Sequence, residues 1–277
     1  MISARTVSLL LISLLPLAGC GKNYTAYALT SSSQVIEFDT NTPSTIQNTA
    51  TISGLNSGEY VTAMAYDPGG QLYCVTNDGF ICTLDPSTGD ATLVGTQFVD
   101  TTTVNPAFSN PMISVDPTVS QVRVITVSYN FLVPEQGGAG TVGTKLAYAS
   151  GDTNSGQTPA PAAITYANPF TSASSTTLYV LDSTTGSLDY VGATNVDDTT
   201  QGNGGVLHTV GSTGITFASS GGFAIEQQSG DAYAALQSAG AGASLYTVDL
   251  SNGGVGNVGQ IGDGTLSLIA LAIAPGQ

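Results

Sequence analysis

Residues 63–76, AMAYDPGGQLYCVT, contain the pattern on which the predicted architecture rests. A short apolar strand ends in Asp-Pro, a gap follows, and the chain continues as an alternating strand that carries a tyrosine. Residues 112–126, MISVDPTVSQVRVIT, are a close copy without the tyrosine, and residues 223–237, FAIEQQSGDAYAALQ, are a looser copy without the proline. This internal repetition predicts a fold built from similar modules.

A second, eleven-residue pattern, Asp-x-x-(Thr/Asn)-Gly-x4-Val-Gly, occurs three times without a gap. Its copies are DPSTGDATLVG at 85–95, DSTTGSLDYVG at 182–192 and DLSNGGVGNVG at 249–259. Each copy follows an alternating strand. An aspartate that accepts backbone N–H bonds and a glycine that adopts positive φ are typical of a turn, so each copy predicts a β-hairpin.

The two ends of the sequence share one module. Residues 270–277, ALAIAPGQ, begin the first pattern again, and strands at 27–30 and 35–39 resemble its continuation. A module with its first strand at one end of the chain and the others at the opposite end predicts a closed ring, because closure removes exposed sheet edges. Residues 268–274 should then pair with residues 25–30.

The spacing of the hairpin aspartates predicts five four-stranded modules. The hairpin expected between the first two copies is degenerate, at 130–140, and residues 193–212 are interpreted as an inserted loop rich in Gly, Thr and Asp. We therefore predict an all-β, closed β-propeller that spans residues 24–277 as a single domain and is closed by N- and C-terminal strands in one blade. A sixth blade from residues 193–220 and a β-sandwich are the alternatives.

Composition excludes several kinds of partner. The 277 residues include 4 Lys and Arg and 19 Asp and Glu, which gives a formal net charge of −15. Nucleic-acid binding and a polybasic membrane patch both need a cationic surface, so neither is expected. The hydrophobic fraction of 41% is nevertheless ample for a packed core, unlike that of an acidic disordered chain.

The N-terminus is typical of export. Residues 1–19 have a positive Arg5 followed by an eleven-residue apolar stretch, which predicts a signal peptide. The end of this segment, LAGC at 17–20, resembles the bacterial lipobox, which implies cleavage before Cys20 and lipidation of its thiol. Residues 20–23 are then a lipidated tether to the cell envelope, and Gly21 implies the outer membrane if the host is Gram-negative. An ordinary signal peptide with an incidental cysteine is the alternative.

The chain resembles an uncharacterised bacterial family of secreted, propeller-like proteins, domain of unknown function 4394. The matching stretches are 27–39, 70–95, 110–126, 145–170 and 176–192. The resemblance implies an exported propeller-like protein without an established activity. This chain has Gln121 where the family often has a basic residue before Val122, which weakens any charge-based site inferred from the family.

Few residues suggest catalysis. His208 is the only histidine, and we expect it in a loop or at a strand end, so no catalytic residue is predicted. Arg123, the only arginine after Cys20, is a candidate anion contact near the axis of the ring, or else part of a structural ion pair. Asp152 and Asn154 have the spacing of two calcium ligands, with a plain Asx turn as the alternative. Whether a metal binds is left open.

These observations favour a non-catalytic binding or scaffolding propeller on the cell envelope. Its partner would be an unidentified extracellular or periplasmic ligand or protein, and no cofactor is expected. The alternative is a calcium-dependent propeller hydrolase or lactonase with an axial carboxylate cluster, for which the candidates are Glu37, Glu59, Glu135 and Glu226. Packing in a cell-surface layer is a third possibility.

A disulfide is predicted between Cys74 and Cys82. A three-residue loop at 77–79 with glycine in the left-handed position pairs Thr76 with Phe80 and places the two cysteines directly opposite each other. Export supplies an oxidising compartment, and lipidation of Cys20 leaves an even number of cysteines. Two buried free thiols are the alternative.

Overall fold

The computed structural model describes residues 22–99, 110–196 and 202–276. Within these ranges the chain forms 21 β-strands and one helical turn at 202–204. None of the described helical residues belongs to a helix long and apolar enough to cross a membrane. The alternation of apolar and polar residues and the frequent glycine and proline breaks explain this strand-rich structure.

The strands form five sheets, which we call blades 1 to 5, each given from its inner to its outer strand. Blade 1 contains β21 (Leu268–Ile273), β1 (Thr25–Thr30), β2 (Gln34–Asp39) and β3 (Ile46–Thr51). Blade 2 contains β4 (Val61–Tyr66), β5 (Leu72–Thr76), β6 (Ile81–Leu84) and β7 (Ala91–Val94). Blade 3 contains β8 (Met112–Asp116), β9 (Gln121–Ile125), β10 (Asn130–Pro134) and β11 (Thr141–Gly143). Blade 4 contains β13 (Pro161–Tyr166), β14 (Thr176–Asp182), β15 (Ser187–Val196), β16 (Val206–Ser212) and β12 (Ala147–Tyr148). Blade 5 contains β17 (Gly221–Ile225), β18 (Ala232–Leu236), β19 (Ser244–Val248) and β20 (Val255–Gln260).

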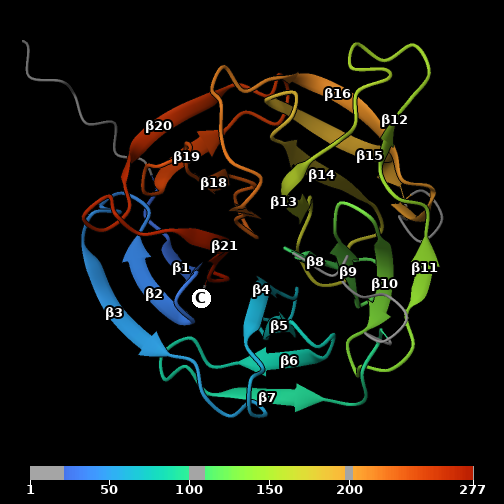
Figure 1. The fold of residues 1–277 in the computed structure, drawn as a ribbon. Coiled ribbons are helices and arrows are strands. Elements are labelled where there is room, and N and C mark those ends of the chain that lie inside the picture. Colours follow the sequence, from blue (N-terminus) through green and yellow to red (C-terminus); the bar gives the residue numbers. More distant parts are fainter. Residues whose placement is uncertain (1–21, 100–109, 197–201, 277) are drawn as a thin grey trace, which may run out of the picture.

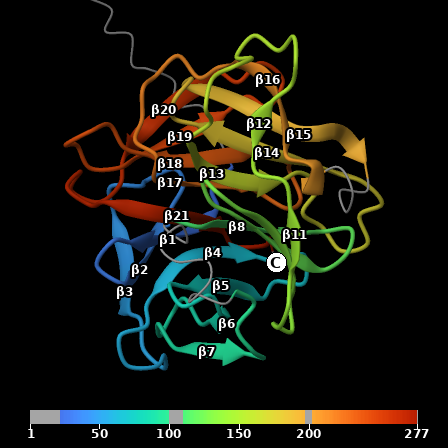
Figure 2. The same cartoon turned by 45° about the vertical axis from the view of Figure 1, so that its right-hand side comes forward.

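The five blades are arranged in a ring around a central axis (Figure 1), and Figure 2 shows the same ring obliquely. Their inner strands contact one another in a complete cycle, in which β4 touches β8, β8 touches β13, β13 touches β17, β17 touches β21 and β21 touches β4. The predicted five-bladed β-propeller is therefore found, and a two-sheet sandwich is excluded.

Apolar packing lies mainly between the blades. The described residues form five clusters of buried apolar side chains, and each cluster joins two neighbouring blades. Blades 5 and 1 share the cluster that contains Phe38 and Leu245, for example, whereas blades 3 and 4 share the one that contains Ile125 and Leu178. Each blade thus buries both of its faces, which explains the nearly continuous burial of the inner strands.

Blade 1 combines strands from distant parts of the sequence. β21 pairs antiparallel with β1, with Ala28 opposite Leu271, and the amide of Ala274 donates to the carbonyl oxygen of Thr25 at 2.9 Å. β1 in turn pairs with β2. The predicted pairing of residues 268–274 with residues 25–30 is confirmed.

Blade 4 departs from the prediction in two ways. The hairpin motif at 182–192 connects its second and third strands, whereas the copies at 85–95 and 249–259 connect third and fourth strands. The segment 193–212 is not an inserted loop, because its first four residues extend β15 and its last seven form β16. It completes blade 4 and makes no sixth blade. The two-residue β12 then adds to β16 in parallel, so this blade has five strands.

The predicted disulfide is present. Cys74 lies directly opposite Cys82 between β5 and β6, with a Cα–Cα distance of 4.8 Å, and the two sulfur atoms are bonded. The amide of Thr76 donates to the carbonyl oxygen of Phe80, and Gly79 has φ of 79°, as the three-residue loop requires. Both cysteines are fully buried between blades 1 and 2.

Candidate functional site

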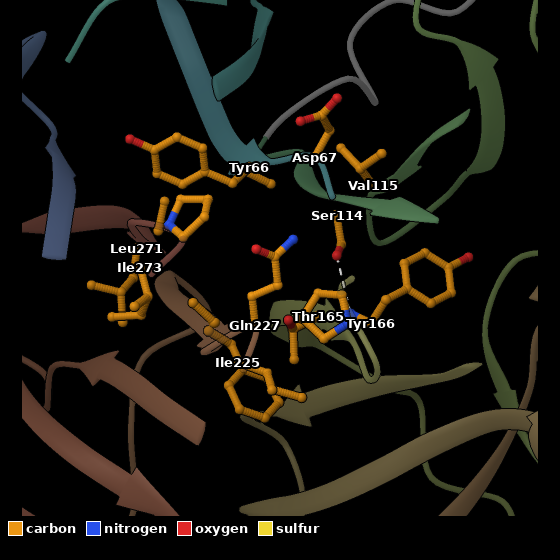
Figure 3. Close-up of a pocket in the computed structure, with 16 residues that line it drawn as sticks. Tyr66, Asp67, Ser114, Val115, Thr165, Tyr166, Ile225, Gln227, Leu271 and Ile273 are labelled. Atoms are coloured by element: carbon orange, nitrogen blue, oxygen red, sulfur yellow. Dashed lines mark hydrogen bonds between the residues drawn. The ribbon is translucent and has the colours of Figure 1, made fainter. Parts of the chain in front are cut away.

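A cleft opens on the axis of the ring where the five inner strands end, and we call it the end cleft (Figure 3). It has a volume of about 40 Å³. All five blades contribute to its lining, which consists of Ala65, Tyr66, Asp67, Ser114, Val115, Thr165, Tyr166, Pro169, Phe223, Ala224, Ile225, Gln227, Leu271, Ala272, Ile273 and Pro275. The repeated inner strand therefore builds the site, with one contribution from each module.

Small residues let the inner strands approach one another at the axis. The second-last residues of β4, β17 and β21 are the alanines Ala65, Ala224 and Ala272, and all three line the cleft. Deeper in the ring, a Cβ atom on Gly222 would lie 2.1 Å from the backbone nitrogen of Leu271, so only glycine fits there. The axis below the cleft is narrow and lined by apolar residues such as Met64, Ile164 and Leu271.

Gln227 crosses the mouth of the end cleft. Its side chain starts from the segment after β17 and extends toward blade 2 (Figure 3), where Nε2 donates to the carbonyl oxygen of Pro68 at 2.7 Å. Blades 5 and 2 are not neighbours in the ring, since blade 1 lies between them. The glutamine therefore forms a hydrogen-bonded bridge over part of the opening.

Hydrogen bonds within and between blades hold two other polar groups of the cleft, Ser114 and Asp67. The amide of Tyr166 donates to Ser114 Oγ at 3.0 Å, which joins blade 4 to blade 3. Oδ1 of Asp67 accepts from the amide of Gln71 at 2.7 Å in the turn after β4. Among the described residues no donor binds Oδ2 of Asp67, which is available to a ligand.

The cleft end of the ring is electronegative. Burial raises the pKa of Glu135, which follows β10, and the negative charge of Asp67 raises it further. Burial likewise raises the pKa of Tyr73, with added repulsion from Glu135 and Asp67. Asp116 is the last residue of β8, and Glu226 directly follows β17, so both lie at this same end of the ring. The local charge therefore favours a cationic ligand over an anionic one.

Arg123 lies behind the cleft wall. Its side chain is fully buried between blades 3 and 4, where Nε donates to the Tyr166 hydroxyl at 3.1 Å. Nη1 donates to the side-chain oxygens of Asn130 at 3.1 Å and Asn203 at 2.6 Å. Because the hydroxyl of Tyr166 points away from the cleft (Figure 3), Arg123 fixes a residue of the wall and does not face the opening.

Asp152 and Asn154 come together on the outer side of blade 4. The amide of Asn154 donates to Oδ1 of Asp152 at 2.9 Å, which forms the Asx turn, and both side chains bond the Thr209 hydroxyl. Burial raises the pKa of Asp152, but hydrogen bonds from Thr209 and Asn154 and the nearby His208 lower it overall. Both carboxylate oxygens of Asp152 thus already accept hydrogen bonds from Thr209.

The four glutamates of the hydrolase alternative do not gather at the axis. Glu37 lies in β2, Glu59 precedes β4, and Glu226 follows β17 and accepts the amides of its own turn. In the part of the chain that the structure describes, no group of three or more His, Cys, Asp and Glu side chains has the geometry of a metal site. The described residues therefore do not form the predicted axial cluster.

The remaining predicted residues lie elsewhere. His208 is within strand β16 rather than in a loop or at a strand end, and it stacks on Tyr190 with ring centroids 5.0 Å apart. The signal peptide and Cys20 are outside the described residues.

Sequence reasoning also missed two features. One is Gln227, whose only signal is that this copy of the inner-strand pattern lacks the proline. The other is a cluster in blade 4 of the half-buried Tyr148 with the buried Asp182 and Asp189, which had no signal because Asp182 occupies an ordinary motif position.

Comparisons with known proteins place the chain among proteins of similar fold. The family model "Domain of unknown function (DUF4394)" matches residues 34–272. No match was found among curated proteins. A solved structure of a structural-genomics protein of unknown function from Bacteroides thetaiotaomicron is 15% identical with a TM-score of 0.53, and the match covers 91% of this chain and 66% of that one.

Two further structures are more distant. A protein of unknown function from Bacteroides caccae is 11% identical with a TM-score of 0.39, over 91% of this chain and 99% of that one. TolB from Acinetobacter baumannii is 12% identical with a TM-score of 0.46, over 92% of this chain and 67% of that one. The chain thus spans about two thirds of the first and third of these proteins, and the likeness concerns the fold alone.

Proposed function

The chain belongs to the family of domain of unknown function 4394, a membership that assigns no activity, and we propose that it is a non-catalytic binding propeller whose end cleft receives a side chain of a partner. The observation that carries this proposal is the size and lining of the cleft. Pockets that enclose small-molecule substrates usually have about 300–1,000 Å³, and the end cleft is far smaller, at about 40 Å³. An apolar group inserted from a larger partner fits this space better.

The rim of the cleft indicates the chemistry of that partner. Aliphatic and aromatic residues make up most of the lining, and Asp67, Thr165 and Gln227 provide polar side chains. The negative charge of Asp67 and Glu135 favours a cation next to the inserted apolar group. We therefore propose a protein or peptide partner that presents a large aliphatic residue beside a lysine or arginine.

Short peptides test this proposal. Acetylated and amidated tripeptides Ala-Leu-Lys and Ala-Leu-Glu are titrated into the protein by calorimetry. We expect only the lysine peptide to bind, with a weak Kd of about 1 mM because few groups are buried. Asp67→Asn should remove the preference for lysine, and Ala272→Leu should fill the cleft and abolish binding.

Asp263→Asn is the matched control, since Asp263 lies in an exposed turn before β21, at the opposite end of the ring. It should leave the affinity unchanged. Equal binding of both peptides, or binding that survives Ala272→Leu, would show that the cleft is not the site.

The location is a proposal that rests on residues 1–23. We propose that the protein is exported and held on the cell envelope, at the outer membrane in a Gram-negative host, by lipid on Cys20. The intact mass should then exceed that of residues 20–277 by the acyl and glyceryl groups, and Cys20→Ala should release the protein from membranes. Unchanged membrane association of this variant would refute the anchor.

We also propose that the pairing of β21 with β1 holds the ring closed. Through this pairing β21 completes the four strands of blade 1, and β21 is also the inner strand that contacts β4 and β17. A chain that ends at residue 267 should lose cooperative thermal unfolding, and a peptide of residues 268–277 should restore it. Cooperative unfolding of the shortened chain at the wild-type Tm would refute the proposal.

A further inference from the structure

Blade 4 contains two buried carboxyl groups that meet at one hydroxyl. Asp182, at the end of β14, and Asp189, in β15, are both fully buried. The hydroxyl oxygen of Tyr148 in β12 lies 2.7 Å from Oδ2 of Asp182 and 2.8 Å from Oδ2 of Asp189. Both distances are typical of hydrogen bonds between oxygen atoms.

The number of protons on the three side chains determines whether both contacts can be hydrogen bonds. A tyrosine hydroxyl has one proton to donate, and an ionised carboxylate can only accept. Tyr148 can therefore donate to one aspartate, and the contact with the other is a hydrogen bond only if that carboxyl group has its own proton. Two ionised carboxylates at these distances would instead leave a buried, unpaired negative charge.

Among the described residues, the hydrogen bonds around the pair do not replace the second proton. The hydroxyl of Ser187 donates to Oδ1 of Asp189 at 2.8 Å, and Oδ1 of Asp182 accepts the amides of Ala160 and Thr184. Thr185 bonds the hydroxyls of Ser187 and Tyr148. On β16, the hydroxyl of Thr209 donates to Asp152 at 2.7 Å.

The charged groups around the cluster can also be named. Asp152, on the loop after β12, reaches it through Thr209, and His208 on β16 stacks on Tyr190 and interacts electrostatically with Asp152. The described interactions of the cluster include no lysine or arginine. The nearest charges are thus mostly negative and oppose a second ionised carboxylate.

We propose that Asp182 and Asp189 hold one proton between them through the Tyr148 hydroxyl, and that this proton-binding site fastens β12 to blade 4. In this arrangement the protonated carboxyl group donates to Tyr148, and Tyr148 donates to the other carboxylate. Burial, followed by the charge of Asp182, raises the pKa of Asp189 to about 7, against the lowering effect of hydrogen bonds from Ser187, Tyr148 and Thr209. The pair is therefore expected to release its proton near neutral pH.

Release of the proton should loosen the β12 edge. Two backbone hydrogen bonds of 2.9 Å, from the amides of Ala147 and Ala149 to the carbonyl oxygens of Gly205 and Leu207, hold β12 on β16. Tyr148 is the side chain between them, and it lies on the cluster. Repulsion between two ionised aspartates would push Tyr148 out and expose these amides.

The pH dependence has a definite sign. A carboxyl group whose pKa is higher in the folded state binds the proton more tightly there, so its contribution to stability is present at low pH and lost as pH rises through the folded pKa. The Tm of the wild-type protein should therefore fall by roughly 5 °C between about pH 5 and pH 8. Asp189→Asn should remove this fall, because the amide donates to Tyr148 at every pH.

A local measurement and a matched control make the test specific. In the wild-type protein, hydrogen-exchange protection of the Ala147 and Ala149 amides should fall about tenfold from pH 6 to pH 8.5, after correction for intrinsic exchange. Asp189→Asn should abolish that fall. The control Asp85→Asn changes the aspartate that corresponds to Asp182 in the blade 2 copy of the hairpin motif, and it should leave both pH profiles as in the wild type.

A pH profile of Asp189→Asn that equals the wild-type profile would overturn the proposal. If that variant does not fold, carbon NMR of aspartate-labelled wild-type protein replaces it. One aspartate carboxyl carbon should titrate near pH 7, and the absence of any aspartate titration between pH 5.5 and 8.5 would equally overturn the proposal.

Discussion

Blades 2 and 4 contain the same hairpin motif, and it plays a different part in each. In blade 2 it connects the outer strands β6 and β7, and Asp85 is exposed, where its carboxylate accepts the amide and hydroxyl of Ser87. In blade 4 it connects the middle strands β14 and β15, and Asp182 is fully buried. Gly89 and Gly186 adopt positive φ in both turns. The motif thus specifies a turn, and the position of that turn in the blade depends on the rest of the fold.

The two blades are also cross-linked by different chemistry. Blade 2 has the buried disulfide between β5 and β6, whereas blade 4 has the hydrogen bonds of Tyr148, Asp182 and Asp189. A disulfide responds to reduction and a carboxyl pair responds to pH. We therefore expect blade 2 to be sensitive to reductant and blade 4 to be sensitive to pH, and four predictions test this contrast.

The largest expected effect is that of Asp182→Ala. The substitution removes the acceptor of two backbone amides and of the Tyr148 hydroxyl, so it should lower the free energy of unfolding by about 2–3 kcal/mol. Asp85→Ala removes only exposed hydrogen bonds and should cost less than about 1 kcal/mol. Urea unfolding of both variants measures the difference, and equal losses would remove the contrast between the two motif copies.

Loss of the disulfide should come next. The variant with both Cys74→Ala and Cys82→Ala should lose about 2 kcal/mol, because the cross-link closes a short loop and restricts the unfolded chain. Wild-type protein unfolded in excess reductant should show the same loss. A smaller loss in reductant than in the double variant would mean that most of the variant's loss comes from the cavity left by the two removed sulfur atoms, and not from the missing cross-link.

The two sensitivities should be independent. The contacts of the disulfide lie in blades 1 and 2, and those of the carboxyl pair lie in blade 4. Effects at separate sites usually add to within about 0.5 kcal/mol. The change in Tm between pH 5.5 and pH 8.5 should therefore be the same in oxidised and reduced protein. A pH effect that disappears on reduction would show that the ring couples the two blades.

The smallest effect is expected for Asp85→Asn. Hydrogen bonds from the Ser87 hydroxyl and amide lower the pKa of Asp85, so its contribution to stability is present above the unfolded pKa and is lost as pH falls through the folded pKa. Solvent screening of this exposed group limits the effect to about 0.5 kcal/mol, visible only below about pH 4. A larger effect of Asp85→Asn near neutral pH would contradict the assignment of the neutral-pH change in stability to blade 4.

Local patterns predicted the features that depend on neighbouring residues. The Asn-Asp-Gly turn and strand alternation were enough to place Cys74 opposite Cys82, since the register of a hairpin follows from its loop. The pairing of β21 with β1 followed from the incomplete repeat at 270–277. Both inferences use the periodicity of single strands.

Features that depend on contacts between blades were not predicted. The sequence does not show that Arg123 reaches Tyr166, because these residues are in separate modules. Asp182 and Asp85 have nearly the same local sequence, so burial of one of them has no local signal. The end cleft combines two or three residues from each of five inner strands, and only the ring geometry brings them together.

The pairing of β21 with β1 also has a consequence for the timing of folding. β1 ends at Thr30, and β21 begins only at Leu268. At a synthesis rate of about 5–20 residues per second, the second strand is made roughly ten to fifty seconds after the first. During that interval β1 is an unpaired sheet edge, which invites pairing with another chain. The first blade to begin is therefore the last to be completed, and an interruption near the end of synthesis would leave every earlier strand in place but the most aggregation-prone edge uncovered.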